Sequence, residues 1–292
     1  MTVTLENNKL RVVFSEHGAE MVSLYGKEKQ FEYLWQADPQ YWGRHAPVLF
    51  PIVGRLQADH YRFAGQSYEM HQHGFARDQD FTVVKQTKTA VVFELKASNS
   101  TKEKYPFAFV LKLSYTLHAE SVAVTYTVEN PANQKSYFSI GGHPAFNLPM
   151  GDPQLDFADY HVELTPHKER QQISLVGNYT DVAHAVKTTT NDIALSHKLF
   201  AHDALIFNLQ AEPTTLTLTD AAAHTGVTLR LENAEYCGIW SPYPAQAPFV
   251  CLEPWWGLAD DVTAKGELST KNAIHALPAQ TSFTGKYEIS VF

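Results

Sequence analysis

The segment PFVCLEPWWGLAD, residues 248–260, holds a glutamate in surroundings that should change its chemistry. Glu253 ends an apolar run and is followed by a proline and two tryptophans. Burial disfavours the charged form of a carboxyl group, so the pKa of Glu253 should rise above about 4.3, which makes it a better general base. Trp255 and Trp256 offer flat faces for the C–H side of a sugar ring. The alternative is an inward charge paired with an arginine, with both tryptophans in the core.

A second candidate is His143, in the segment GGHPAFN at residues 141–147. The two glycines before it allow a sharp bend or a close approach of the backbone to a ligand. Pro144 fixes the chain after it. A histidine in such a rigid corner has few rotamers left to lose. These neighbours favour a functional histidine over a buried one whose ring is satisfied by backbone carbonyls.

Two more histidines occur in HQHGFAR, residues 71–77. Residues two apart on a strand share a face, so on a strand His71 and His73 can point into one pocket. That spacing also suits a metal, as in the cupin sandwiches, although residues 74–80 lack the glutamate of the cupin pattern. A carboxylate from elsewhere leaves a metal site open. Two partly exposed strand histidines are the remaining alternative.

Another candidate is Arg55, in the segment HAPVLFPIVGRL at residues 45–56. Two prolines flank an apolar run in this segment, which ends at Gly54 and Arg55. A guanidinium at the wall of a cleft can bridge two hydroxyl groups of a sugar. Proline in sheets is confined to edges, so the segment taken alone favours an edge strand with a surface arginine.

Apolar and polar side chains alternate with a period of two in several segments, and this alternation predicts the β-strands that must position these residues. Such runs occur at residues 91–96, 111–118, 122–129, 216–218, 227–231 and 287–291. Each places one face on a core and the other toward water or a second layer. A weak helical pattern appears only at residues 182–200. We therefore predict an all-β fold, a large antiparallel β-sandwich, formed by residues 1–292 as a single domain.

Composition limits the partners of this chain. Of its 292 residues, 44% are hydrophobic, and its net charge is −8, which argues against nucleic acid and anionic membranes. Cys237 and Cys251 are too few for a disulfide framework. The amino-terminal residues lack a signal-peptide pattern, and no stretch approaches the roughly 20 apolar residues that cross a bilayer. We expect a cytoplasmic protein that acts on a neutral small molecule.

Several of these segments together resemble the aldose 1-epimerase (galactose mutarotase) family, particularly its LacX-like branch. The matching stretches are GRL with the following QADHYRF, HGFAR, GGHPAFN and CLEPWWG, which occur in the family's order. The resemblance implies a galactose mutarotase-like β-sandwich that binds an aldohexose in an open cleft, without metal or cofactor. It implies that Glu253 is the general base and that His143 is the general acid.

The same resemblance implies that Arg55 and His73 bind substrate, and that Asp203 holds sugar hydroxyls. The chain departs from the family pattern at two places. Residues 75–77, Phe-Ala-Arg, replace a glycine-rich turn, and residues 142–144, Gly-His-Pro, replace an Asn-His pair followed by an aromatic residue. The acid and the base survive these changes, and the preferred sugar stays open.

The implied reaction interconverts the α and β anomers of an aldose. Glu253 removes the proton of the C1 hydroxyl while the His143 imidazolium protonates the ring oxygen. The ring opens, the C1–C2 bond rotates, and closure on the other face of the aldehyde reverses both proton transfers. Such an acid–base pair needs no metal.

Two other functions fit the same cleft. One is a sugar-binding or regulatory protein, and the other is a hexose-6-phosphate epimerase, to which Arg44 or Arg77 could supply cationic side chains. The net charge of −8 and the absence of a Gly-rich, Lys-bearing phosphate loop favour free sugars. The choice between a monomer and a homodimer stays open.

Overall fold

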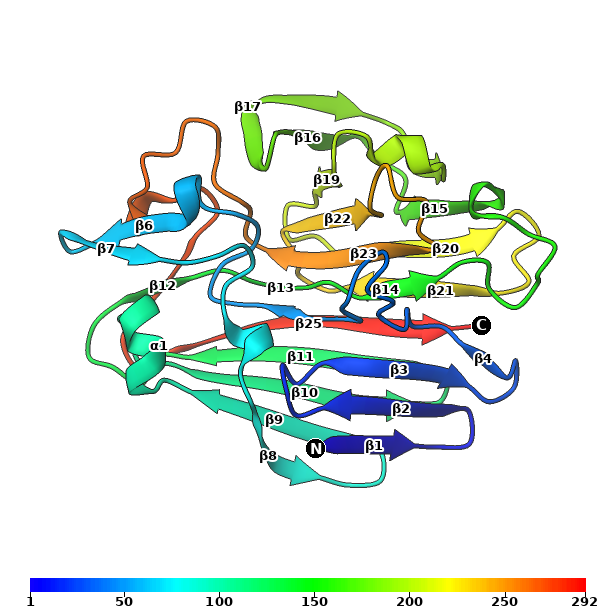
Figure 1. Cartoon of the computed structure of the whole chain (residues 1–292), viewed down its shortest axis with the longest axis horizontal. Helices are drawn as coiled ribbons and strands as arrows, with labels where there is room; N and C mark the ends of the chain where they lie inside the picture. Colours follow the sequence, from blue (N-terminus) through cyan, green and yellow to red (C-terminus); the bar gives the residue numbers. More distant parts are fainter.

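The computed structural model describes residues 1–292, and antiparallel strands dominate it (Figure 1). Its larger sheet has nine strands in the order β18-β15-β20-β21-β25-β11-β10-β9-β8. These are β8 (Thr82–Gln86), β9 (Ala90–Lys96), β10 (Val110–His118), β11 (Ser121–Glu129), β15 (Tyr160–Thr165), β18 (Asp192–Ala194), β20 (Thr214–Asp220), β21 (Gly226–Leu231) and β25 (Ser282–Val291). Every alternating run of the sequence lies in this sheet, which confirms the prediction of antiparallel strands.

The second sheet contains Glu253 in one of its strands and His143 between two of them. Its path is β17-β16-β19-β22-β23-β13-β5, and β14 also pairs with β23. Its strands are β5 (Val48–Leu49), β13 (Ile140–Gly142), β14 (Ala145–Asn147), β16 (Arg170–Val176), β17 (Tyr179–Thr188), β19 (Leu205–Asn208), β22 (Tyr236–Trp240) and β23 (Phe249–Trp256). β5 ends the path, as expected for an edge strand next to prolines.

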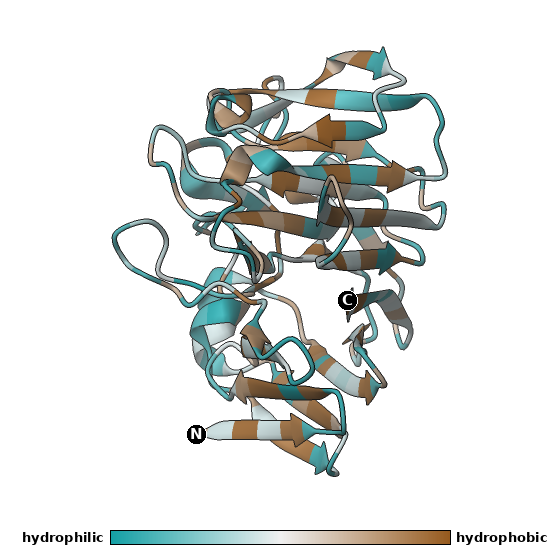
Figure 2. Cartoon of the chain, turned by 90° about the vertical axis from the view of Figure 1, so that its right-hand side faces the viewer, coloured by the Kyte–Doolittle hydropathy of each residue, from teal (hydrophilic) through white to brown (hydrophobic).

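One large apolar core joins the two sheets. A cluster of 63 buried side chains includes Leu113 of β10 and Leu252 of β23. Figure 2 shows apolar and polar residues alternating along many strands, as in a sheet with one face on a core. β23 is different, because all eight of its residues are buried. Leu252 and Trp256 join the large core, whereas Trp255 belongs to a smaller cluster.

Short elements complete the chain. A four-stranded sheet near the amino terminus contains β1 (Thr2–Glu6), β2 (Leu10–Ser15), β3 (Met21–Gly26) and β4 (Phe31–Glu32). The pairs β6 (His60–Phe63) with β7 (Gln66–Glu69) and β12 (Ser136–Phe138) with β24 (His275–Leu277) form two-stranded sheets. Single-turn 3-10 helices are η1 (Gln57–Asp59), η2 (Ala76–Asp78), η3 (Phe157–Asp159), η4 (His197–Phe200) and η5 (Leu268–Thr270).

Helices are scarce. The α-helix α1 (Asn99–Lys104) is only six residues long and begins with a capping box at Ser98. The weak helical pattern at residues 182–200 gives only η4, and β17 and β18 occupy most of that stretch. No helix combines the length and the apolar character that crossing a bilayer requires.

Candidate active site

A cavity of about 620 Å³ opens at the eight-stranded sheet. Five side chains that the sequence predicts to be functional line it, namely Arg55, His73, His143, Asp203 and Glu253. They come from five separate segments, and the sheet and its loops bring them together. The structure thus places all five predicted residues at one cavity, whereas their individual roles stay predictions.

Glu253 lies on β23, a strand that is paired on both sides. Its side chain is 2% exposed and accepts a hydrogen bond from the Trp255 ring Nε1, 3.2 Å from Oε2. Burial raises the pKa of Glu253 well above its ordinary range, against the opposing effect of that hydrogen bond, and the nearby Asp203 adds to the rise. The basic side chain beside its carboxyl group is His143 rather than an arginine.

His143 faces Glu253 across the sheet. Gly141 lies opposite Trp255, and Ala145 lies opposite Cys251. The same register, continued between β13 and β14, places His143 opposite Glu253. Their side chains meet there, with His143 Nε2 3.3 Å from Glu253 Oε2.

The rest of the His143 ring is enclosed by aromatic side chains. Trp42 stacks on it at a centroid distance of 4.7 Å, and Trp240 meets it edge-on at 5.6 Å. Nδ1 is buried without a hydrogen-bond partner, so backbone carbonyls do not satisfy this ring. Burial, followed by the charge of Arg77, lowers the pKa of His143 to about 3. The neutral ring is therefore the stable form in the free cavity.

The break between β13 and β14 accommodates a proline. Pro254 lacks an N–H group and would weaken a central strand, but it lies at the point where β13 ends at Gly142. Gly142 is needed for close packing rather than for a sharp bend. A Cβ atom there would lie 2.7 Å from the Tyr126 hydroxyl and 3.0 Å from the Tyr287 hydroxyl. Only a glycine at position 142 therefore lets the strand pass this close to the two tyrosine hydroxyls.

Arg55 follows a turn that also requires glycine. Gly54 has a φ of +72°, and a Cβ atom there would lie 2.4 Å from the Ala259 Cβ. The Arg55 Nε is 3.6 Å from Asp59 Oδ1 and is buried without a hydrogen-bond partner. An Nη atom lies 3.4 Å from the Gln72 Oε1. Arg55 therefore keeps unsatisfied donors at the cavity, as expected of a residue that binds hydroxyl groups.

His73 is fixed against the same turn. The Gly54 N–H donates to His73 Nδ1 at 3.1 Å, and the His73 N–H donates to the Gly54 carbonyl at 2.8 Å. Burial, with the charges of nearby His143 and arginines, lowers the pKa of His73 well below its ordinary value, so the ring is neutral. Because Nδ1 accepts, the proton lies on Nε2, which leaves Nε2–H as a donor.

The prediction that His71 and His73 share a strand face is wrong. Residues 71–74 form a turn, and His73 has a left-handed φ of +68°. The side chain of His71 is 69% exposed and lies 3.3 Å from Glu69 and 3.8 Å from Asp59. Only His73 lines the cavity, so this pair does not form a cupin-like metal site.

One other group of residues is close enough to hold a metal ion. The ligand atoms of His143, Cys251 and Glu253 lie within 4.8 Å of one another. Burial raises the pKa of the Cys251 thiol well above its ordinary range, so a metal bound through this sulfur would have to displace its proton. The dependence of activity on a chelator distinguishes a metal centre at these three residues from an acid–base pair.

Asp203 lies in the turn after η4 with a φ of +72°. Its Oδ1 accepts a hydrogen bond from the Ala204 N–H at 2.9 Å, and burial raises its pKa. A strained backbone at a cavity is often found where a side chain must be aimed. The position suits the expected contact with sugar hydroxyls.

Sequence reasoning missed part of the cavity wall and misplaced one tryptophan. Trp255 lines the cavity, but Trp256 is in the core, where its Nε1 donates to the Asn233 carbonyl at 2.8 Å. Among the other aromatic residues of the lining, Trp42 and Trp240 pack against the His143 ring. Nothing in their local sequence marks them, because only the fold brings them to His143.

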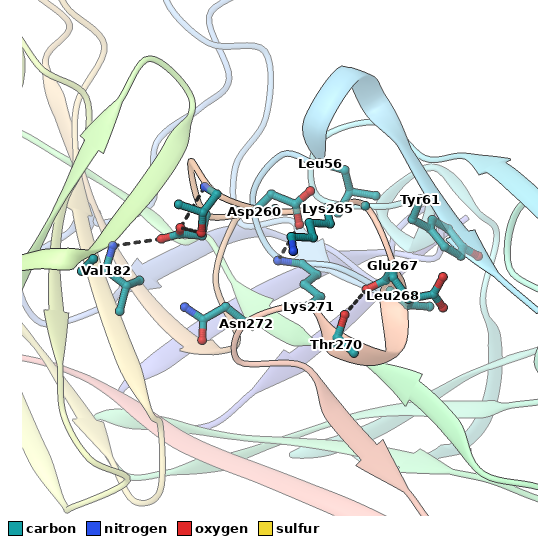
Figure 3. Close-up of a pocket in the computed structure, with 15 residues that line it drawn as sticks. Leu56, Tyr61, Val182, Asp260, Lys265, Glu267, Leu268, Thr270, Lys271 and Asn272 are labelled. Carbon is teal, nitrogen blue, oxygen red and sulfur yellow. Dashed lines mark hydrogen bonds and ion pairs between the residues drawn. The ribbon is translucent and has the colours of Figure 1, made fainter.

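A second cavity, of about 340 Å³, adjoins the segment after Arg55 (Figure 3). Lys271 and Asp260 point toward each other in it, 3.3 Å apart, and both side chains are 3% exposed. The backbone N–H of Asp260 donates to the Arg55 carbonyl at 2.8 Å, and its Oδ2 accepts from the Gln57 N–H. This buried pair therefore fixes the loop that carries Arg55.

Replacing Lys271 with methionine should lower the free energy of unfolding by about 3–5 kcal/mol, because it leaves the Asp260 carboxylate buried without its counter-charge. Urea denaturation measures the change. The control is Lys265→Met in the same loop, at an exposed lysine, which should change stability by at most about 0.5 kcal/mol. Equal effects of the two substitutions would mean that the buried pair does not hold the loop.

Known proteins resemble this chain over its whole length. The family model for aldose 1-epimerase matches residues 1–273. Protein LacX of Lactococcus lactis subsp. lactis is 30% identical, with 100% of this chain and 99% of LacX covered. A galactose mutarotase related enzyme from Lactobacillus acidophilus is 38% identical with a TM-score of 0.97, covering 100% of this chain and 97% of that one. A galactose mutarotase-like protein from Lactobacillus casei is 31% identical with a TM-score of 0.91, and both chains are 100% covered.

Proposed function

Because this chain belongs to the aldose 1-epimerase family, we propose that its epimerase reaction, the interconversion of α and β anomers of an aldose, takes place between Glu253 and His143. The observation that supports this most is the 3.3 Å approach of the carboxyl group and the imidazole at the cavity. The two groups are close enough to act on the C1 hydroxyl and the ring oxygen of one sugar.

The pair shares one proton over a wide pH range. Burial favours a protonated Glu253 and a neutral His143 in the free cavity. Transfer of that proton to His143 gives the carboxylate and the imidazolium that ring opening uses. Glu253 then accepts the C1-hydroxyl proton, and His143 donates its proton to the ring oxygen. Closure on the opposite face of the aldehyde returns both protons, so the pair ends as it began.

The other cavity residues serve as binding groups in this proposal. The Arg55 guanidinium and the His73 Nε2–H donate to sugar hydroxyls, and Asp203 accepts from them. Trp255 offers an apolar face to the ring. With the sugar held in this way, the acid and the base contribute about 10²- to 10⁴-fold each to the rate.

Polarimetry of freshly dissolved α-glucose and α-galactose tests the proposal. The protein should bring each rotation to its equilibrium value faster than buffer does. A sugar-binding protein with the same cavity would bind the sugar, as calorimetry would show, without accelerating the change in rotation. That result would refute the proposed activity.

The pH dependence of kcat/KM should show no break near the ordinary histidine pKa of about 6.5. Activity requires one proton on the pair. It should fall only when a second proton binds His143, whose pKa is about 3, or when Glu253 loses its proton well above its usual range. Initial rates, corrected for the uncatalysed reaction at each pH, give the profile. A sigmoidal loss of activity near pH 6.5 would show that His143 titrates as an ordinary histidine.

Prolonged dialysis against EDTA should leave kcat unchanged, because the proposed proton transfers need only the two side chains. Anomer exchange is measured before and after dialysis, with protein concentration checked by absorbance. If activity were lost and one added divalent ion restored it, His143, Cys251 and Glu253 would instead be ligands of a metal ion.

We also propose that the protein works in the cytoplasm. Cys237 and Cys251 are both free and buried, as is usual in a reducing compartment.

A further inference from the structure

The proposed reaction requires His143 to carry a positive charge in surroundings that disfavour it. Its ring is buried, and the charges of Arg77 and Arg44 oppose its protonation. The His73 ring, at a centroid distance of 5.6 Å, is neutral. Glu253 is the carboxyl group in contact with His143, and it loses its negative charge as it accepts the C1-hydroxyl proton. The imidazolium therefore gains from any further group that attracts a positive charge.

The indole of Trp42 covers a face of the His143 ring. The two ring centroids are 4.7 Å apart and the ring planes differ by 28°, so the rings are stacked. The faces of an indole carry partial negative charge, and a cation within about 6 Å of the ring centroid is attracted to them. Among aromatic side chains this attraction is strongest for tryptophan. Trp42 therefore presents a negative surface to the ring that must become a cation.

Three contacts hold Trp42 in this position. Its carbonyl accepts a hydrogen bond from Trp35 Nε1 at 2.8 Å, and its backbone N–H donates to the Asp38 carbonyl at 3.0 Å. Its ring also stacks on Phe249 of β23 at a centroid distance of 5.9 Å. Because these contacts fix the indole in advance, it need not reorganise when His143 becomes charged.

Trp240 contacts both rings of this stack. Its centroid lies 5.6 Å from that of His143 and 5.9 Å from that of Trp42, with ring planes at 85° and 69° to theirs. The three aromatic rings thus pack together at the cavity, and His143 is buried among them. An attraction between a cation and an aromatic face increases when water is excluded from the pair.

We propose that Trp42 is a positioning residue of the epimerase reaction, and that its indole face stabilises the His143 imidazolium. The inference rests on the proposed function, in which His143 is charged only while the sugar ring opens or closes. The indole then acts on the transition state, where the charge is present, and not on the bound sugar. Trp42 belongs with the reacting pair although a loop carries it, so an exchange of that loop should keep this residue.

Fluorinated tryptophans at position 42 test the inference. Fluorine withdraws charge from the indole face and leaves the size and shape of the ring nearly unchanged. Site-specific incorporation of mono-, di-, tri- and tetrafluorotryptophan gives a graded series. For α-glucose or α-galactose, kcat should fall with each added fluorine and by roughly tenfold over the series, the factor expected of a cation–π contact shielded from water. Sugar affinity, measured by calorimetry, should stay unchanged.

The same series at Trp256 is the matched control. This tryptophan lies in the large core, where its Nε1 donates to the Asn233 carbonyl. Fluorination there should leave kcat unchanged. Thermal melting checks the fold of every protein in both series.

Two ordinary substitutions make the same comparison without modified amino acids. Trp42→Phe keeps a smaller aromatic face, whereas Trp42→Leu keeps an apolar side chain without one. We expect kcat to fall by about threefold in Trp42→Phe and by about tenfold or more in Trp42→Leu. Equal losses in the two folded variants would contradict a role of the aromatic face.

The outcomes separate this inference from the proposed function. A constant kcat across the fluorine series at position 42 would mean that Trp42 only packs against His143, and would overturn the inference while the epimerase proposal stands. Weaker sugar affinity at constant kcat would make Trp42 a surface for the sugar ring and would overturn the inference equally. If the unmodified protein accelerated no anomer exchange, both would be overturned.

Discussion

Glu253→Gln should lower kcat for anomer exchange by about 10²-fold or more, while the protein still folds and binds sugar. The amide keeps the shape and the hydrogen-bonding reach of the carboxyl group but cannot take a proton from the C1 hydroxyl. Polarimetry on the purified variant measures kcat, and calorimetry measures sugar binding. A folded Glu253→Gln protein with nearly normal turnover would remove the base from the mechanism.

The same substitution has a predicted effect on stability. Burial raises the pKa of Glu253 above the value of 4.5 expected for the unfolded chain. Between these two pKa values the native protein binds more protons than the unfolded chain, so native stability falls as pH rises. Because glutamine does not titrate, this loss of native stability with rising pH should disappear in the variant. At neutral pH its melting temperature should equal or exceed that of the native protein.

Melting curves at several pH values test this prediction. Glu232→Gln, at an exposed position, is the control and should change neither turnover nor the pH dependence of melting. If Glu253 were only a buried structural charge, its amide variant would instead melt at a lower temperature and keep its activity per folded molecule.

His143→Asn should also lower kcat by about 10²-fold or more, because no other group can protonate the ring oxygen from that position. The double variant with Glu253→Gln should lose much less than the product of the two single losses, since an acid and a base that act on one transition state behave as a unit. A double-mutant cycle tests this, with rates measured on the two single variants and the double variant after each is shown to be folded. His118→Asn, at an exposed strand end, is the control.

Multiplicative losses would contradict this mechanism. They would mean that Glu253 and His143 contribute independently, for example one to binding and the other to chemistry. Full activity of His143→Asn would mean that another residue of the cavity is the general acid. His73 would be the first candidate, because its Nε2–H is a free donor.

Six of the nine strands of the larger sheet, β9, β10, β11, β20, β21 and β25, could be predicted from sequence because each has one face on the core. In β11, buried residues alternate with half-buried ones, so the apolar pattern has a period of two. β23 shows no such period, because one of its faces lies in the large core and the other contacts two smaller apolar clusters. The order of the strands and the break between β13 and β14 depend on contacts far apart in the chain. The single domain over residues 1–292 stays a prediction.

The cavity was only partly predictable for a related reason. Glu253 and His143 were found because their unusual neighbours are adjacent in sequence. His71 was misjudged because local spacing suggested a strand, whereas His73 adopts a left-handed turn. Trp42 and Trp240 reach His143 through the fold alone.

The pairing of β23 with β13 and β14 has a consequence for how this architecture can acquire new substrates. His143 and Glu253 are held opposite each other by one strand register, deep in a sheet. Other side chains of the cavity lie outside the strands, Arg44 and Asp203 on loops and Arg77 in the 3-10 helix η2. Those loops can be exchanged or redesigned without moving the reacting pair. In the proposed mechanism, the part of the molecule that performs the reaction is therefore separate from the part that selects the sugar, and grafted loops should yield epimerases of new specificity from the same sheet.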